Sequence, residues 1–530
     1  MSVLTNENLK GFIEFYLSAK IKLPADLREK RIGEWDVSRV TDMANMFNGC
    51  SNFNEPLDGW SIGLVTNMTS MFAGCSRFNQ PLDNWDVSKV TDMSYMFSSC
   101  FDFNGALDNW NVGNVTGMEN MFYRCNKFKQ PLTSWSKRLG KVKSMKNMFY
   151  QCLSFNQPMN GWEVHHVSDM AGMFQYCDAF NQPLDKWNVA EVKNMKQMFQ
   201  YCSKFNRPLD GWDVGNVTDM ERMFESCTIF DQPLNGWNVS NVENMSYMFH
   251  MCSFDRPIDG WKSRLDKVET MAGMFRYSAF NHPLNDWDVK NVKNMSSMFA
   301  VNVAFDQPLN GWNVSNVVDM ENMFIGCKKF NQPLDRWNVG KVKNMGGMFY
   351  ECFSFNQSLN KWDVSKVNNM QTMFYNCLSF NQPLDKWKVA KTTNTFAMFR
   401  DAKNFKEITW IDRDQRHNRT KAVSELNKNL RLVPELKRYI KEAKIIPPPE
   451  EGDAQRPANI SFFHEDYKKW MESFERKTQG KSKSNSKSKS KSKSQSNSDS
   501  ATRATRTRAI SKILTVRKGG RATRKLKIRR

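Results

Sequence analysis

The chain has 530 residues, among them 33 Met, 38 Phe and 17 Trp, and a formal net charge of +21. Residues 476–530 hold 20 of its 76 Lys and Arg residues but only one of its 55 acidic residues, Asp499. The rest of the chain is nearly neutral, which argues against nucleic-acid binding over the whole protein. No run of about 18 apolar residues occurs, which excludes a transmembrane helix, and the first residues do not resemble a secretory signal.

The first predicted element is a helix over residues 6–19. Leu9, Phe12, Ile13 and Tyr16 recur at the three- and four-residue spacing of one helical face. A repeat array must protect its open ends, so we interpret residues 1–31 as an N-terminal helical cap.

A repeat of about 25 residues occupies residues 32–405. Its consensus runs from Trp through two Val, two Met, Phe, Cys and Phe to Asn-Gln-Pro-Leu, and a tryptophan marks the start of each unit. These tryptophans are Trp35, Trp60, Trp85, Trp110, Trp135, Trp162, Trp187, Trp212, Trp237, Trp261, Trp287, Trp312, Trp337, Trp362 and Trp387. Fifteen such copies predict about 15 stacked coils, because one unit is too small to bury its own apolar face.

Two spacings alternate inside each unit. Val90, Met93, Met96, Phe97 and Cys100 follow one face of a helix, and Asp92 precedes that run where its side chain would cap a helix. The segment 82–87 ends in the alternation of a short strand. We therefore predict an α/β repeat fold, with one short parallel strand and one short helix per coil in a right-handed solenoid.

The twelve cysteines all occupy one slot of the repeat. Consecutive thiols are about 25 residues apart, whereas zinc sites use clustered Cys and His ligands, and Ser278, Asn302 and Ala402 replace three of them. We expect reduced, buried thiols in a reducing compartment rather than disulfides or a metal site. The Asn or Asp after the second Phe, as at Asn54 and Asn79, is expected to bond backbone groups between coils.

Two coils carry a two-residue insertion between Trp and Val. The segments 135–142 and 261–268 both contain Arg-Leu and a Lys before Val, and they lie five coils apart. Coils spaced by about 4.8 Å would place the two bulges roughly 24 Å apart on one ridge. The candidate partner-binding residues there are Lys137, Arg138, Lys141, Lys262, Arg264 and Lys267. Neutral drift in a surface loop or duplication of a five-coil block explains the insertions as well.

The chain beyond the repeats divides into three parts. An apolar helical pattern predicts a C-terminal cap at 406–445, and residues 446–479 combine a Pro-rich linker with an amphipathic helix. Residues 480–530 form a basic tail. Its first part, an alternation of Lys and Ser, has no apolar residues from which a core could form, so we expect the tail to be disordered. Its candidate nucleic-acid contacts are Arg503, Arg506, Arg508, Arg517, Lys518, Arg521, Arg524 and Lys525, with a solubilising or nuclear-import role as the alternative.

No motif for catalysis appears. The six histidines fall in unrelated slots, and neither a Gly-rich phosphate loop nor a nucleophile elbow is present. We expect a monomeric protein that is not an enzyme and that needs no cofactor and no metal.

The repeat resembles the BspA-like branch of leucine-rich repeats, which includes the surface-protein repeat of Listeria- and Mycoplasma-type bacteria and also occurs in protists and large DNA viruses. The resemblance rests on segments such as 90–100 and 103–112 and covers about residues 32–405. It implies a right-handed α/β solenoid that binds other macromolecules and carries no catalytic residue. The sequence departs from the general leucine-rich pattern at Val90, where asparagine is usual.

The sequence therefore predicts a scaffold that binds an unidentified protein or glycan. The alternative is a virion or nucleic-acid-associated structural protein whose binding resides in the tail. The missing secretory signal favours the cytoplasm, the nucleus or a virion.

Overall fold

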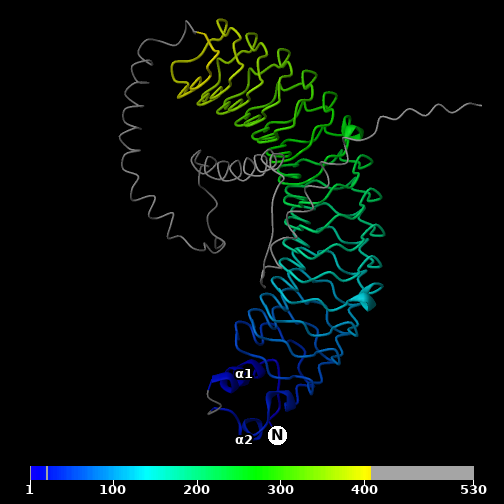
Figure 1. Cartoon of the computed structure of the whole chain (residues 1–530). Helices are drawn as coiled ribbons and strands as arrows, with labels where there is room; N and C mark the ends of the chain where they lie inside the picture. The colour runs from blue at the N-terminus through cyan, green and yellow to red at the C-terminus, as the bar shows by residue number, and fades with distance from the viewer. Residues whose placement is uncertain (1, 19–21, 407–530) are drawn as a thin grey trace, which may run out of the picture. The chain divides into compact units, whose positions relative to one another are not determined.

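The computed structural model describes residues 2–18 and 22–406 (Figure 1). In these ranges the chain forms helix α1 (Leu9–Ser18), helix α2 (Ala25–Arg28) and the short 3-10 helices η1 (Ile32–Glu34), η2 (Thr133–Trp135) and η3 (Asp259–Trp261). The predicted cap at 406–445, the segment 446–479 and the tail at 480–530 lie outside the described residues, apart from residue 406. No helix in the described ranges is long and apolar enough to cross a membrane.

The repeats form coils that stack in chain order (Figure 1). One residue of each coil pairs in parallel with its equivalent in the next, from Asp42 with Asn67 to Asn369 with Asn394. Beyond this pair, every second backbone N–H donates to the next coil. Asn45, Phe47 and Gly49 of the first coil donate to the carbonyls of Thr69, Met71 and Ala73 at 2.9, 2.8 and 2.7 Å. We call this row of bonds the backbone ladder.

The short helix predicted in each coil is wrong. In the first coil the N–H groups of Met46 and Cys50 bond to carbonyls three residues back, at Met43 and Phe47. The third residues of these two turns, Asn45 and Gly49, have φ of 58° and 79°. A positive φ at this position defines a type II turn, which a right-handed helix cannot contain. The slot before the second Met and the slot before Cys keep a positive φ in every coil.

Coil spacing explains this error. An α-helix with its side chains is about 10 Å across, whereas hydrogen-bonded neighbours lie about 4.8 Å apart. Helices therefore cannot stack directly on each other at the spacing that the ladder imposes. A series of turns also directs apolar side chains inward at a spacing of three and four residues. The sequence pattern therefore could not distinguish a helix from a series of turns.

The predicted strand also lies elsewhere. In the segment 82–87, the N–H of Trp85 bonds within its own coil to the carbonyl of Leu82, and the N–H of Val90 bonds to Val87. These groups are therefore not directed at a neighbouring coil. The parallel pairing instead uses the Asp or Asn slot before the first Met, such as Asp92, and is one residue long. Asp92 accepts from the N–H of Ser94 at 2.8 Å, so it closes a turn rather than capping a helix.

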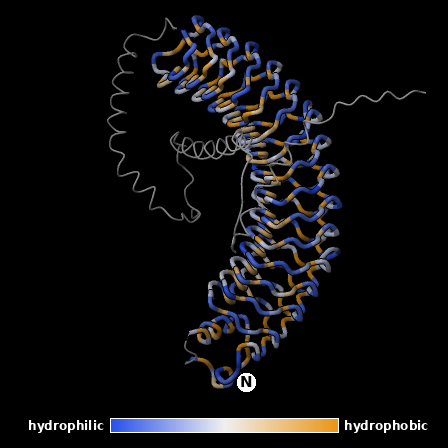
Figure 2. The backbone as a smooth tube through the Cα atoms, viewed as in Figure 1, coloured by the Kyte–Doolittle hydropathy of each residue, from blue (hydrophilic) through white to orange (hydrophobic). Residues whose placement is uncertain are grey.

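The core is a set of columns, each made of one residue type per coil. Figure 2 shows apolar and polar segments alternating around the coils. The indole of Trp212 stacks 6.4 Å from that of Trp187, and its N–H donates to the carbonyl of Leu184 at 2.9 Å. Within the same coil as Trp187, the rings of Phe199 and Phe205 stack at 4.2 Å. Packing of identical side chains thus fixes the register between coils.

Helix α1 covers the first coil. Leu9, Ile13 and Tyr16 are buried, and the Tyr16 hydroxyl donates to Glu55 at 2.6 Å. The side-chain oxygen of Asn6 accepts from the N–H groups of Thr41 and Asp42 at 2.9 and 3.2 Å. This contact satisfies backbone donors that have no preceding coil to bond.

Candidate interaction surface

The ladder brings four polar slots of each coil to one side of the stack. These slots are the two residues between the first and second Met and the two residues between Phe and Cys. In the first coil they hold Ala44, Asn45, Asn48 and Gly49. We call the surface made by these slots in all coils the ladder face. The Met, Phe and Cys side chains between them point into the core, which is why the other slots point outward.

Tyrosine gathers on the ladder face. Of the ten tyrosines in the described residues, nine lie in its slots, and the tenth is Tyr16 of α1. The nine are Tyr95, Tyr123, Tyr150, Tyr176, Tyr201, Tyr247, Tyr277, Tyr350 and Tyr375. The side chains of Tyr95 and Tyr201 are 43% and 38% exposed. This surface was not among the predictions from sequence, although tyrosine is restricted to a few repeat slots there.

Four of these rings form a continuous row across neighbouring coils. Tyr123 stacks on Tyr150 with ring centroids 4.4 Å apart, Tyr150 meets Tyr176 edge to face at 5.6 Å, and Tyr176 stacks on Tyr201 at 4.6 Å. Stacked aromatic rings hold one another in place, so little conformational entropy remains to be lost when a partner binds. The row is therefore a preorganised aromatic surface.

A row of buried polar side chains lies beside the aromatic row. Gln175 donates to Gln200, Gln200 donates to Glu225 at 2.6 Å, and Glu225 faces Nδ1 of His250 at 3.0 Å. The carboxylate of Glu225 is 3% exposed and also accepts from Arg222 at 2.8 Å. All four residues occupy the ladder-face slot directly after Phe, so four successive coils share one hydrogen-bonded network within the ladder face.

The charges of this network are set by burial and by its ion pairs. Burial would raise the pKa of Glu225, but the hydrogen bond of His250 and the charge of Arg222 outweigh it and lower that pKa. Burial lowers the pKa of His250 despite the opposing effect of Glu225. The Nε2 atom of His250 is buried and has no hydrogen-bond partner in the described residues. A proton there would be unsolvated, so neutral His250 donates through Nδ1 to an ionised Glu225.

Arginine extends the aromatic surface toward the next coils. The guanidinium of Arg222 lies 4.4 Å from the ring centroid of Tyr247, within the range of a cation–π contact. Lys196 pairs with Glu221 at 2.8 Å, and Glu221 contacts Arg222 at 3.2 Å. The centre of the ladder face thus combines aromatic, Arg and His side chains held by their neighbours.

The six residues predicted on the two insertions lie on matching bulges. Arg138 donates to the carbonyl of Trp110 at 3.1 Å, and Arg264 donates to that of Trp237 at 2.9 Å. Lys141 and Lys267 each donate to an Asn side chain of the preceding coil at 2.6 Å. Four of the six therefore fasten their bulge to the coil before it. Lys137 and Lys262 are exposed. The predicted nucleic-acid contacts between Arg503 and Lys525 lie outside the described residues.

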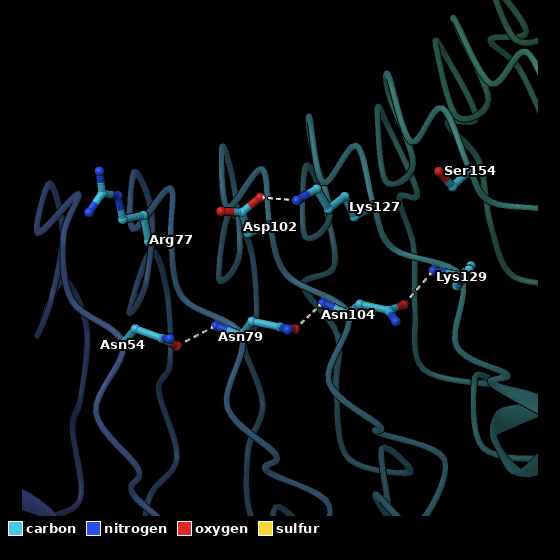
Figure 3. A pocket seen from close by; sticks show the side chains of 8 residues that line it. All are labelled: Asn54, Arg77, Asn79, Asp102, Asn104, Lys127, Lys129 and Ser154. Carbon is cyan, nitrogen blue, oxygen red and sulfur yellow. Dashed lines mark hydrogen bonds and ion pairs between the residues drawn. The ribbon is translucent and has the colours of Figure 1, made fainter.

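The predicted bonds between coils from the Asn after the second Phe are confirmed. Asn54, Asn79 and Asn104 each accept from the N–H of the next coil at 2.9, 2.8 and 3.0 Å, which Figure 3 shows as a row. Lys129 ends this row, because its side chain has no oxygen to offer to the N–H of Asn156. A shallow polar depression lies here, lined also by Arg77, Asp102, Lys127 and Ser154. Lys127 and Asp102 pair at 2.6 Å across it.

The predicted burial of the thiols is confirmed, with one exception. Eleven of the twelve cysteines are buried, and Cys50 in the first coil is half-buried. The usual partner of the thiol is the Phe carbonyl of the preceding coil, at 3.0 Å from Cys100 to Phe72. No group of three or more His, Cys, Asp or Glu side chains within residues 2–18 and 22–406 is placed to hold a metal ion.

These features define a tandem-repeat protein whose coils are joined by a backbone ladder. The model of a family described as "Mycoplasma protein of unknown function, DUF285" matches residues 20–135, 136–234, 184–276, 253–349 and 301–415. These matches cover well over half of the chain, which therefore belongs to this family. No similar protein was found among curated proteins. A leucine-rich repeat protein from Eubacterium ventriosum is similar at 13% identity over 71% of this chain and 84% of that chain, with a TM-score of 0.30.

Proposed function

We propose that this protein is a non-catalytic scaffold that binds another protein through the centre of its ladder face. The observation that carries the proposal is the gathering of nine tyrosines in the outward slots of one side of the stack. Tyrosine and arginine dominate the binding energy of protein interfaces because they bury large areas at low entropic cost. Neither residue is needed in these slots for the repeat itself, since Ala, Ser, Gly and Asn fill them in other coils.

The buried network supports the same surface. Gln175, Gln200, Glu225 and His250 are bonded in a row across four successive coils, three of which also carry Tyr176, Tyr201 and Tyr247. The hydrogen bonds of this network hold the backbone that carries these rings in place. The site is therefore built on a rigid part of the stack rather than on a loop.

The experiment compares two double variants of the full chain. A partner is first identified by crosslinking to the full-length protein, and its affinity is then measured by calorimetry. We expect Tyr176→Ser with Tyr201→Ser to weaken binding at least about 10-fold, as loss of two interface anchors does. The matched control is Leu153→Ser with Ile229→Ser, which removes apolar side chains that are 42% and 46% exposed at other slots. Equal affinity of the two double variants for the partner would refute the proposal that the ladder face binds it. Binding that depends on a glycan would show that the partner is a glycan and not a protein.

We also propose that the repeat is a BspA-like variant of the leucine-rich repeat wound as a right-handed solenoid. Its support is the Trp-to-Leu consensus, the stacking of one coil per repeat and the match to a repeat family of Mycoplasma proteins. On this basis the two bulges at Lys137 and Lys262 are secondary contact points on one ridge.

The second candidate function, nucleic-acid association through the tail in a virion or the nucleus, is favoured by charge. Twenty basic residues and one acidic residue lie between 476 and 530, while the remaining chain is nearly neutral. Binding by such a tail releases counterions, so its affinity should fall steeply with salt and ignore sequence. A salt titration of the full chain against duplex DNA, beside a chain truncated after residue 479, tests this role. Equal binding by the two chains would reject it.

A further inference from the structure

The row of side-chain bonds between coils is interrupted at one place. From Asn79 to Asn381, the N–H of the residue after the second Phe donates to the Asn or Asp side chain of the preceding coil in every coil but one. The exception is Asn156, which follows Lys129 in this row. Its N–H has no acceptor within residues 2–18 and 22–406. Asn156 is exposed, so a molecule from solvent can supply the missing acceptor.

Two lysines stand where this acceptor is missing. Lys127 and Lys129 flank Phe128 in the sequence, are exposed, and line the polar depression described above (Figure 3). Along the rest of the described repeats, no coil has a basic residue on both sides of its second Phe. Each N–H of the row is directed at the same slot of the preceding coil, so the N–H of Asn156 is directed at Lys129. An unbonded backbone donor and two ammonium groups therefore gather on neighbouring coils.

The depression is positively charged. Its lining contains three basic residues, Arg77, Lys127 and Lys129, and one acidic residue, Asp102, which leaves two positive charges in excess. Lys127 pairs with Asp102 at 2.6 Å, whereas Arg77 and Lys129 form no ion pair in the described part of the chain. The depression has a volume of about 460 Å³, which gives room to a ligand group. Its charge favours an anion with two negative charges.

A phosphate monoester has the chemistry that this arrangement recognises. Near pH 7 it carries about 1.5 to 2 negative charges and three strong acceptor oxygens. Lysine ammonium groups and backbone N–H groups both form charge-assisted hydrogen bonds to such oxygens. A carboxylate carries a single charge, so it would leave one positive charge unmatched. The depression is shallow, whereas a site for a small molecule encloses most of its ligand, so a phosphate that projects from a protein surface fits better.

We propose that this depression binds the phosphorylated side chain of a serine or threonine on a partner protein. The phosphate oxygens accept from the ammonium groups of Lys127 and Lys129 and from the N–H of Asn156. The phosphate thus takes the place of the side-chain oxygen that the row lacks at Lys129. None of these residues occupies a slot of the ladder face, so this site and the ladder-face site stand or fall separately.

Calorimetric titration of the full chain with N-acetyl-phosphoserine amide tests the site. It is carried out at about 0.15 M salt, where charges more than about 8 Å apart are largely screened. Lys127→Ser and Lys129→Ala should each weaken binding at least about 10-fold, because each removes a hydrogen bond between charged groups. Lys129→Asn should weaken it more than Lys129→Ala, because the new side chain accepts from the N–H of Asn156 and so competes with the phosphate.

The matched control is Lys204→Ser. Lys204 occupies the slot of Lys127 in a coil whose row is unbroken, because the N–H of Asn206 donates to Asn181 at 3.1 Å. This variant loses the same charge from an equivalent position, so its affinity should equal that of the natural protein. The unphosphorylated N-acetyl-serine amide should not bind. Urea midpoints of all variants establish that each is folded.

Three results would overturn the proposal. Equal affinity of Lys129→Ala and Lys129→Asn would exclude the N–H of Asn156 from the site. Affinity that no variant changes would place the phosphate on other basic residues of the chain. Tighter binding of glucose 6-phosphate than of the phosphoserine derivative would assign the depression to a phosphorylated small molecule and not to a protein.

Discussion

The thiol of Cys202 donates to the carbonyl oxygen of Phe174 in the preceding coil, with the two atoms 2.9 Å apart. The same bond recurs between Cys100 and Phe72 and between Cys352 and Phe324. The carbonyl of Phe174 already accepts from the N–H of Cys177 in its own turn at 2.9 Å, so the thiol uses the second lone pair of the same oxygen. The cysteine column is therefore a polar link between coils as well as part of the apolar core.

The first prediction concerns the reactivity of this column. Burial raises the pKa of Cys202 well above its usual value, and only the thiolate attacks a thiol reagent. We expect the native protein at pH 8 to label rapidly at one thiol, Cys50, and at the other eleven only after denaturant is added. Cys50→Ser should abolish the rapid phase. Rapid labelling of several thiols in the folded protein would contradict the buried column.

The second prediction is a loss of stability at alkaline pH. The thiols of Cys125 and Cys202 ionise near their ordinary pKa of 9.0 in the unfolded chain, but burial raises both values in the folded protein. Above pH 9 the unfolded state therefore binds fewer protons, and each such thiol lowers the free energy of unfolding by about 1.4 kcal/mol per pH unit.

Urea unfolding between pH 8.5 and 10.5 measures this dependence. Cys125→Ala with Cys202→Ala should flatten the slope by about 3 kcal/mol per pH unit. Cys50→Ala, which removes a half-buried thiol, should flatten it less. An unchanged slope in the double variant would show that other groups dominate.

The third prediction repairs the interrupted row of asparagines. Asn104 accepts from the N–H of Lys129 at 3.0 Å, but Lys129 offers no oxygen to Asn156 in the following coil. Lys129→Asn should supply that acceptor and stabilise the protein by about 1 kcal/mol, the usual net value of one hydrogen bond. Asn79→Ala should destabilise the protein by a similar amount, because the backbone N–H of Asn104 then loses the side-chain oxygen to which it donates. Urea midpoints measure both, and a destabilising Lys129→Asn would contradict the interpretation.

The fourth prediction concerns acid. Burial lowers the pKa of His250 below its ordinary value of 6.5. As the pH falls past 6.5, His250 is therefore protonated in the unfolded state while it stays neutral in the folded state. Stability should therefore be complete above this pH and fall as the pH drops toward the lowered pKa of the folded state. His250→Gln keeps a donor for Glu225 and should remove this fall between pH 7 and 5. His166→Gln, beside Glu191 on another surface, serves as the control.

Several features of the fold could be predicted because the repeat imposes them. The tryptophan period gave the number of coils, the identical slots gave the buried thiols, and the Asn after the second Phe indicated bonds between coils. The helix and the strand were predicted wrongly. Spacings of three and four residues suit a helix and a series of turns equally well, and only the spacing between coils rules out the helix.

The interaction surface depended on tertiary structure for a different reason. Tyr176 and Tyr201 are 25 residues apart in sequence, as are Gln200 and Glu225, and nothing local joins them. Stacking of coils in register places the ring centroids of Tyr176 and Tyr201 4.6 Å apart. It also brings Gln200 within 2.6 Å of Glu225, where the two form a hydrogen bond. The two insertions were predicted from sequence to bind a partner, yet Arg138 and Arg264 donate to backbone carbonyls of the preceding coil.

The sequence by itself determined the repeat, its period, the residues of the core and the separation of a basic tail from a nearly neutral body. The repeat and its core follow from the burial of apolar side chains, which a repeated pattern of apolar residues shows directly. The separation of the tail from the body follows from the distribution of charged residues along the chain. Only the tertiary structure decided how the backbone of each coil is arranged, because ladder bonds between coils compete with bonds within a coil. It also decided which outward side chains become neighbours, since register across coils is a property of the whole stack.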